Sequence, residues 1–378
     1  MRLRLRELIA LSLSTYVLSV FAKVLYPGFY TDIIALYYRV VVPTHNGIPY
    51  HAYWLEYPAI PAILIWVSGN APTAQMYLWT MAFLMSFFVV GTVYFLYRTC
   101  TEFGLDRGRI LPFLIMAPSF LVMVFFNWDI LALCFVSAAF YFAFKRKLRI
   151  AGLCLGLGLA AKAFPILLLP AFLKEGHSWT ERIETGLAAV LGAAIPYLPF
   201  VILDFQSLVG VHESSYSTVY VEDSIWMLGR YFGLIQQDWI VLAVAWSLIF
   251  LAILHMTFSR HSLVLKSWVI TAVAMLVYPS YPPQYNMWLL PMFVLYPAFG
   301  LIPFLVFDFL DTTIISYWFA ADNPFQQWGI IWDISLIRIA LLVALMIWVT
   351  YKSSKTIART TKLENKIEPS PSLSSKSG

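Results

Sequence analysis

A few ionisable side chains stand out because the sequence around them is strongly apolar. Asp32 and Glu56 lie among aromatic residues, and Lys162 lies inside an apolar stretch, where a charge costs about 2.5 to 3.5 kcal/mol on insertion scales. A carboxylate can accept a proton, and a lysine can hold an anion without a metal. Structural roles are also open, because Asp32 could complement a helix start and the other two could form ion pairs. These three residues are the first candidates for a functional site.

The composition of the chain excludes a water-soluble fold. Of its 378 residues, 61% are hydrophobic and 12% are charged, whereas soluble domains carry about 25% charged residues. Apolar runs such as residues 78–97 and 240–256 approach the roughly 20 residues that a helix needs to cross a membrane. A transmembrane barrel would instead alternate apolar and polar residues over segments of about 10. We therefore predict an all-α integral membrane protein with many spans.

The basic residues predict how the helices thread through the membrane. They lie in short clusters beside apolar runs, which argues against nucleic acid as a partner and marks cytoplasmic loops. When every cluster is placed inside, the chain has about 12 helical spans, some of them short broken helices, and cytoplasmic N- and C-termini. The expected spans are residues 7–26, 73–97, 110–126, 129–144, 150–161, 163–173, 186–203, 236–257, 265–278, 286–297, 299–319 and 332–351.

These spans form one predicted transmembrane domain, residues 1–352. Its first external loop, residues 27–72, is expected to contain interfacial helices, because the apolar run 60–67 is too short to span. Residues 353–378 are rich in Ser, Lys and Thr and are predicted to be a disordered cytoplasmic tail. The apolar start is expected to be an uncleaved first span, because no small-residue cleavage site follows it.

The sequence around Lys162 predicts a cavity within the membrane. The apolar segments 151–161 and 163–173 flank this lysine, and about 11 residues at 1.5 Å each reach only about 17 Å, roughly half of a 30 Å hydrocarbon core. Polar backbone between two such half-length helices is tolerated only where it lines a cavity or is buried in protein. The cavity would open on the outer side, which it would share with residues 27–72, 127–129, 204–235, 279–285 and 320–331.

Five short motifs follow one another in an order that resembles one family of membrane enzymes. They are Gly47-Ile-Pro-Tyr50, Glu56-Tyr57-Pro58, Asn127-Trp128-Asp129, Lys162-Ala-Phe-Pro165 and Pro283-Gln284-Tyr285-Asn286, and Asp32 precedes them in the aromatic-rich first loop. Over roughly residues 25–295 the chain resembles the polyprenol-phosphate-mannose-dependent mannosyltransferases of the GT-C superfamily. The resemblance implies a GT-C-like fold and transfer of a sugar, expected to be mannose, from a polyprenyl phosphate to a lipid-linked acceptor. Transfer would proceed with inversion on the non-cytoplasmic side.

The resemblance also implies roles for individual residues. Asp32 stands where the family has its general base, and the departing phosphate needs fixed cations, for which Lys162 and Arg230 are the candidates. The expected substrate-binding residues are His51, Glu56, Tyr57, Asn127, Asp129, Gln284 and Tyr285. Asn127 and Asp129 could equally cap a helix, and Arg230 could equally be a paired or topological arginine. Ile34 stands where some related enzymes carry a second carboxylate, so neither a metal nor another cofactor is expected.

Two other functions remain open from the sequence. A transporter or lipid flippase would show internal repeats with broken helices in matching halves, but only one broken-helix corner is found and the halves do not match. A non-catalytic subunit of a glycosylation complex would keep the fold without needing Asp32. An ATP-driven pump is disfavoured because the sequence has no phosphate-binding loop. In every case membrane lipids are expected partners.

Overall fold

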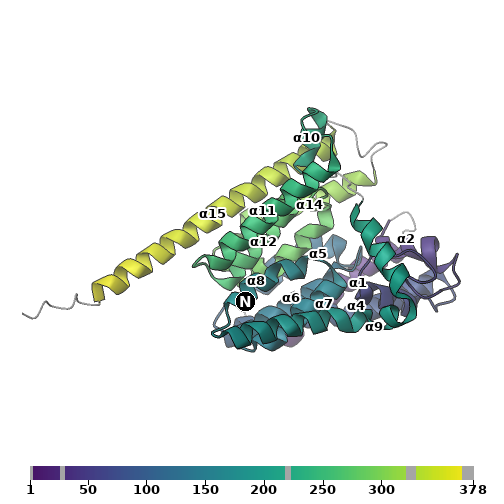
Figure 1. The fold of residues 1–378 in the computed structure, drawn as a ribbon, viewed down its shortest axis with the longest axis horizontal. Helices are drawn as coiled ribbons and strands as arrows, with labels where there is room; N and C mark the ends of the chain where they lie inside the picture. The colour runs from purple at the N-terminus through teal and green to yellow at the C-terminus, as the bar shows by residue number, and fades with distance from the viewer. Residues whose placement is uncertain (1–2, 26–29, 218–222, 321–328, 368–378) are drawn as a thin grey trace, which may run out of the picture.

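The chain folds into a bundle of helices of very unequal length (Figure 1). The computed structural model describes residues 3–25, 30–217, 223–320 and 329–367, and within these ranges it has no β-strand, only one isolated bridge between Pro49 and Tyr53. The α-helices are α1 (Leu5–Leu25), α2 (Asp32–Leu36), α3 (Ala59–Ser68), α4 (Ala74–Glu102), α5 (Pro118–Met123), α6 (Asp129–Phe144), α7 (Leu148–Ala161), α8 (Leu169–Lys174), α9 (Trp179–Ser217), α10 (Trp226–Tyr231), α11 (Asp238–Phe258), α12 (Leu263–Val277), α13 (Leu290–Leu295), α14 (Leu301–Trp318) and α15 (Ile330–Ile367). Short 3₁₀ and π segments are η1 (Tyr37–Val41), η2 (Arg107–Arg109), η3 (Leu111–Ile115), η4 (Phe164–Leu168) and η5 (Pro283–Leu289).

Six of the described helices are long and apolar enough to cross a membrane. They are α1, α4, α11 and α14, with Trp179–Val211 of α9 and Ile330–Ala358 of α15. Large apolar side chains on them face outward, among them Leu18 at 64%, Phe83 at 64% and Ile202 at 75% exposure, which an aqueous surface would not tolerate over so wide an area. The predictions of an all-α chain and of an integral membrane protein are confirmed. The count of about 12 spans and the cytoplasmic termini stay predictions.

Shorter helices fill the interior of the bundle. In α6, 13 of the 16 residues are buried, so protein rather than lipid surrounds this helix. Glycines bring α7 against α9: a Cβ added to Gly156 would lie 2.0 Å from the carbonyl oxygen of Ala189, and one added to Gly152 would lie 2.2 Å from that of Thr185. Small residues of this kind let helix backbones approach closely in membrane proteins.

The predicted break at Lys162 is confirmed. Helix α7 ends at Ala161, Lys162 has an extended backbone (φ −159°, ψ 149°), and the chain resumes as η4 and α8. Pro165 and Pro170 stand at the starts of η4 and α8, and because each proline lacks a backbone N–H and its ring clashes with the carbonyl four residues earlier, both disfavour one continuous helix here. Two half-length segments therefore meet at the lysine, as the sequence predicts.

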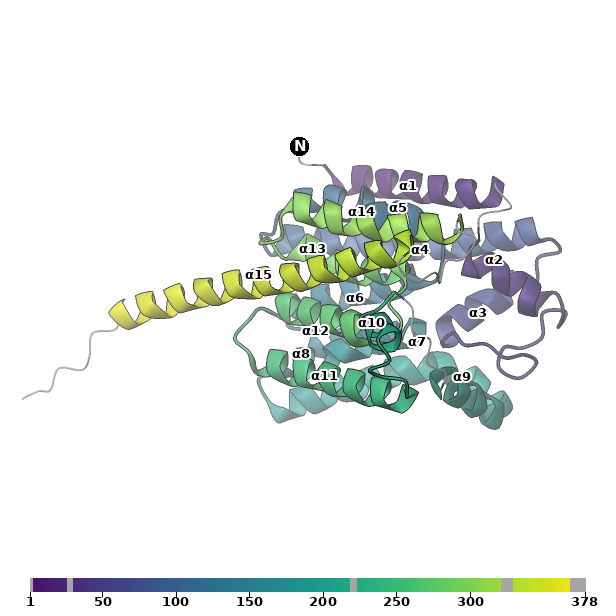
Figure 2. The ribbon, with the colours of Figure 1, turned by 90° about the horizontal axis from the view of Figure 1, so that it is seen from above.

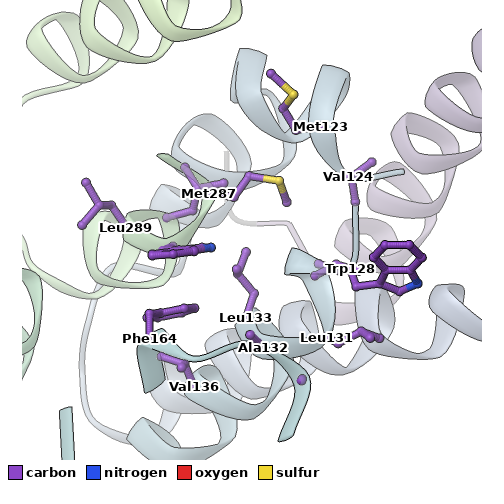
Figure 3. Close-up of a cluster of buried hydrophobic side chains, with 14 of the residues drawn as sticks. Met123, Val124, Trp128, Leu131, Ala132, Leu133, Val136, Phe164, Met287 and Leu289 are labelled. Carbon is purple, nitrogen blue, oxygen red and sulfur yellow. The ribbon is translucent and has the colours of Figure 1, made fainter. Parts of the chain in front are cut away.

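A buried apolar cluster joins this corner to distant parts of the chain. Leu133 of α6, Phe164 of η4 and Met287 of η5 lie together in it (Figure 3). None of these side chains is more than 3% exposed. The cluster therefore fixes the Lys162 corner against the first turns of α6 and against η5.

The predicted external loop lies at the opposite end of the bundle from the start of α1 and the end of α15. In both ribbon views α2 and α3 occupy one end, whereas the start of α1 and the C-terminal end of α15 point toward the other (Figure 1 and Figure 2). The bundle ends thus separate the segments that the basic residues assign to different sides of the membrane.

The predicted disordered tail differs from the structure over residues 353–367. There α15 continues as one helix to Ile367. These residues include no proline and no glycine, the two types that most disfavour a helix interior, and Pro369 is the first helix breaker that follows. Residues 368–378 of the predicted tail and residues 27–29 of the first external loop lie outside the described residues.

Candidate active site

Segments far apart in the sequence meet around one cavity of about 360 Å³. Seven of the ten predicted site residues line it, namely Asp32, Glu56, Tyr57, Asn127, Lys162, Gln284 and Tyr285. The other lining residues are Pro58, Ala163, Phe164, Ile166, Leu167, Trp246, Ile249, Ala274, Met275, Tyr278 and Trp288. Three of the segments that the charge pattern places on one side of the membrane, residues 27–72, 127–129 and 279–285, thus contribute to the cavity, together with residues of η4, α11 and α12.

Asp32 is held at the start of α2 by its backbone and by its carboxylate. Thr31 caps this helix, and the backbone N–H of Asp32 donates to the carbonyl of Phe126 at 3.1 Å. The Oδ2 of Asp32 accepts hydrogen bonds from Tyr57 Oη at 3.0 Å and from Asn127 Nδ2 at 2.6 Å. Burial raises the pKa of the Asp32 carboxyl, although the Tyr57 hydrogen bond and the charge of Lys162 oppose that rise. A carboxylate that is oriented by two donors and has a raised pKa suits a general base.

Lys162 occupies the corner where α7 ends. Its Nζ lies 3.2 Å from Asp129 Oδ1 and is 5.9 Å and 5.7 Å from the ring centroids of Tyr57 and Tyr285. The side chain is 13% exposed and lines the cavity. Lys162 is therefore paired with a carboxylate and also lines the cavity. Its position is compatible both with an ion pair and with the binding of an anion.

Asp129 lies behind Lys162 and not in the cavity wall. Its side chain is fully buried, and Oδ1 also accepts a hydrogen bond from Trp288 Nε1 at 2.8 Å. The other oxygen, Oδ2, is buried and has no hydrogen-bond partner among the described residues. Because Asp129 does not line the cavity, the expectation that it contacts a sugar stays a prediction. Neither Asp129 nor Asn127 caps a helix, since α6 begins at Asp129 without a side-chain cap.

Stacked aromatic rings form one wall of the cavity. The ring of Trp288 is 4.4 Å from that of Phe164 with an interplanar angle of 10°, and 3.8 Å from that of Tyr285 at 23°. Phe164 and Trp288 both line the cavity but were not among the predicted site residues. The signal was available, since Phe164 is part of the Lys162-Ala-Phe-Pro165 motif and Trp288 closely follows Gln284 and Tyr285.

Glu56 forms an ion pair at the cavity. The Nη2 of Arg39 lies 2.5 Å from Oε1 of Glu56, and the two side chains are 54% and 34% exposed. Because Glu56 also lines the cavity, the pair stands between the cavity and the surface. Arg39 was not predicted as a site residue.

His51 and Arg230 are not brought to the cavity. His51 Nδ1 lies 2.8 Å from Asp204 Oδ2, at the point where α9 kinks. Arg230 pairs with Asp238 and donates to the carbonyl of Gln236 at 2.6 Å. Both side chains are held by partners away from the cavity, so substrate binding by His51 and phosphate binding by Arg230 stay predictions that the cavity lining does not support.

Both polar and apolar side chains line the cavity. The charged and amide groups come from α2, the loop before α3, the segment before α6, the Lys162 corner and η5, and Leu167, Ile249 and Met275 are among the apolar residues. Over the described ranges, no three His, Cys, Asp or Glu side chains come together as metal ligands. An amphipathic molecule, with a polar head and an apolar tail, matches this mixed lining.

The fold and the cavity define an integral membrane protein with a largely apolar cavity that also carries charged side chains. The model of glycosyltransferase family 87 matches residues 54–279, more than half of the chain. The chain belongs to this family and is a membrane glycosyltransferase. This membership argues against the transporter alternative. No curated protein and no solved structure matches the chain.

The matched range covers only part of the cavity. It includes Asn127 and Lys162 but begins after Asp32 and ends before Gln284. Residues on both sides of the matched range therefore complete the site.

Proposed function

We propose that this protein transfers a hexose, expected to be mannose, from a polyprenyl phosphate to a lipid-linked acceptor. The observation that carries the proposal is that Asp32 and Lys162 line one cavity whose remaining lining is largely apolar. A donor with a phosphate, a sugar and an isoprenoid tail matches such a cavity. The identity of the sugar rests on the resemblance of the five motifs to mannosyltransferases.

Asp32 acts as the general base in this proposal. The acceptor hydroxyl gives its proton to the Asp32 carboxylate, and its oxygen attacks the anomeric carbon from the face opposite the phosphate. The bond between that carbon and the phosphate oxygen breaks, so the product has inverted configuration. Positioned bases contribute about 10²- to 10⁴-fold in rate. The hydrogen bonds from Tyr57 and Asn127 hold the carboxylate in one orientation.

Lys162 stabilises the departing polyprenyl phosphate. Negative charge grows on the phosphate as the bond to the sugar breaks, and a fixed cation in a largely buried site stabilises that charge without reorganising. Asp129 holds the lysine from behind. The proposal therefore needs neither a metal nor Arg230.

An apolar groove beside the cavity extends the surface available to lipid. It has a volume of about 320 Å³, is lined by Leu159, Leu169, Val190, Tyr197 and other residues of α7, α8 and α9, and shares Ile166 with the cavity. Because the groove lies next to the cavity at Ile166, we propose that it receives the isoprenoid chain of the donor. We place the cavity on the non-cytoplasmic side, because the basic clusters lie on the segments that do not build it.

The donor is tested with purified protein in liposomes that contain a lipid extract as acceptor. Radiolabelled mannose is supplied as polyprenyl-phosphate-mannose or as a nucleoside-diphosphate mannose, with polyprenyl-phosphate-glucose as the third donor. We expect label in the lipid fraction from polyprenyl-phosphate-mannose alone. Transfer only from the nucleotide sugar would overturn the proposed donor. Absence of transfer from every donor would favour the non-catalytic subunit.

A further inference from the structure

A fully buried arginine on α15 has no part in the chemistry proposed above. Arg338 is 0% exposed, and its Nη1 donates to Asp311 Oδ1 of α14 at 2.6 Å. Its Nη2 donates to two backbone carbonyls, those of Asp223 and Tyr281, each at 2.8 Å. One guanidinium thus joins α14 and α15 to two irregular segments. Ionisable residues within membrane helices are usually functional.

The carbonyls of residues 277, 279 and 281 are all held by side chains from other elements. Trp226 Nε1 donates to the carbonyl of Val277 at 2.6 Å, and Ser224 Oγ donates to that of Pro279 at 2.6 Å. Arg338 binds the carbonyl of Tyr281, the next one in this alternating series. We call these three donors the carbonyl clamp.

The donors of the carbonyl clamp are themselves fixed. Asp223, directly before Ser224, has a left-handed backbone (φ 51°) and is 2% exposed. Its Oδ1 accepts a hydrogen bond from Ser335 at 3.0 Å, and its carbonyl accepts one from Arg338. Ser335 and Arg338 are neighbours on one face of α15, three residues apart. Helix α15 therefore fixes two segments. One is the turn that carries the three carbonyls, residues 277–281, which we call the clamped turn, and the other is the segment of Ser224 and Trp226, which supplies the other two donors.

The clamped turn leads directly into the cavity wall. The guanidinium carbon of Arg338 lies 3.7 Å from the ring centroid of Tyr281, and Tyr281 Oη donates to Asn286 Oδ1 at 2.6 Å. Gln284 and Tyr285 lie between these two residues and line the cavity. Arg338 does not line it. Arg338 instead contacts the carbonyl and the ring of Tyr281, and Tyr281 precedes the residues that form this wall.

We propose that Arg338 is a positioning residue that holds Gln284 and Tyr285 at the distance from Asp32 and Lys162 that transfer requires. This inference rests on the proposed function for its kinetic consequence, but the position of the turn can be measured without any reaction. Family 87 matches residues 54–279, so both Arg338 and the carbonyl that it clamps at residue 281 lie outside the matched range.

A second arginine provides a matched control. Arg109 also donates to several carbonyls, among them those of Phe293 at 2.7 Å, Val294 at 3.0 Å and Tyr296 at 3.0 Å. These carbonyls follow the same turn in the sequence but belong to α13 and its C-terminal end, and neither they nor Arg109 line the cavity. Arg338→Lys and Arg109→Lys each keep a charge while losing the forked donor.

The test measures the mobility of the turn and the kinetics in the same variants. A nitroxide is attached at Gln284→Cys, which is feasible because the three native cysteines are buried, and its spectrum is recorded with Arg338→Lys, Ser224→Ala or Arg109→Lys. We expect narrower lines, reporting a more mobile turn, with the first two changes and an unchanged spectrum with the third. Ser224→Ala removes no charge, so it remains informative if Arg338→Lys does not fold.

Kinetics are measured in the same backgrounds without the label. For Arg338→Lys we expect kcat/KM for the sugar donor to fall by up to about 10²-fold, the size of effect of a misplacement of about 1 Å, with a rise in donor KM. Folded Arg109→Lys should keep the kcat/KM of the wild type. Unchanged spectra in Arg338→Lys and Ser224→Ala would overturn the clamp. Narrower lines in Arg338→Lys and Ser224→Ala, together with a wild type that transfers no sugar from any donor, would leave the clamp standing and overturn the proposed function.

Discussion

The ammonium of Lys162 lies 3.2 Å from the Oδ1 of Asp129, a carboxylate that has no exposed surface. The same oxygen accepts the indole N–H of Trp288, so one buried atom holds both the cation and the aromatic wall of the cavity. A lysine anchored in this way presents its remaining N–H groups in a fixed direction. Preorganised charge of this kind stabilises a transition state without further rearrangement.

Asp129→Asn should lower kcat without raising the KM for the donor. The amide oxygen can still accept from Trp288, but the lysine loses its counter-charge and its fixed position, which can cost up to about 10²-fold in rate. The cavity also becomes more positive, so binding of an anionic donor is not weakened. Steady-state kinetics check this outcome. A raised donor KM with unchanged kcat would instead support Asp129 as a direct contact of the sugar.

Lys162→Met should remove most of the stabilisation of the leaving phosphate. Loss of one group that binds developing negative charge typically lowers kcat by about 10²- to 10³-fold. Transfer is measured per folded molecule, because the substitution also leaves Asp129 unpaired. Arg230→Met is the control: this arginine pairs with Asp238 away from the cavity, so its loss should not change kcat. An equal loss in both variants would contradict the placement of Arg230.

The pH dependence of transfer should reflect the buried state of Asp32. A protonated carboxyl cannot accept the proton of the acceptor, so kcat/KM falls as the pH decreases through the pKa of Asp32. Burial raises that pKa above its ordinary value of 3.8, which moves the acidic limb of the profile to higher pH. The hydrogen bond from Tyr57 lowers the pKa of Asp32, so Tyr57→Phe should move the limb further upward. A limb that moves downward in Tyr57→Phe would argue against Asp32 as the titrating group.

Transfer should not depend on a divalent metal. Lys162 supplies the positive charge in the proposed reaction, and Ile34 stands where a second carboxylate could have completed a metal site. We expect equal rates after treatment with EDTA and after addition of Mg²⁺ or Mn²⁺. A rate that EDTA abolishes and a metal restores would require a metal in the reaction.

The sequence was sufficient to predict the helix break and seven of the 18 residues that line the cavity, among them all of its charged and amide side chains. Proline and a lone charge within an apolar stretch mark the Lys162 corner, and the basic clusters assign three of the segments that meet around it to one side of the membrane. Which of the two side chains, Asn127 or Asp129, lines the cavity could not be predicted in this way. Residues two apart at a helix start do not face the same way, and which of them meets the cavity depends on how α6 packs.

Contacts between distant segments were also beyond the sequence. His51 pairs with Asp204 because of the path of α9, and Arg230 pairs with Asp238 because of the turn before α11. Arg338 did carry a signal, because it lies in the apolar run around residues 334–349, where a charge is costly. Its partners come from residues 223, 281 and 311, a combination that only the packing of α14 and α15 produces.

The central claim is that Asp32 is the base of a sugar transfer from a polyprenyl phosphate, and one comparison tests it most directly. Transfer from polyprenyl-phosphate-mannose is measured for wild type, Asp32→Asn and Asp204→Asn at equal amounts of folded protein. Asp204 is a carboxylate outside the cavity, and asparagine can keep its hydrogen bond to the backbone N–H of Ser207. We expect a loss of about 10²- to 10⁴-fold for Asp32→Asn and wild-type transfer for Asp204→Asn. Transfer by Asp32→Asn at the wild-type rate would contradict the central claim.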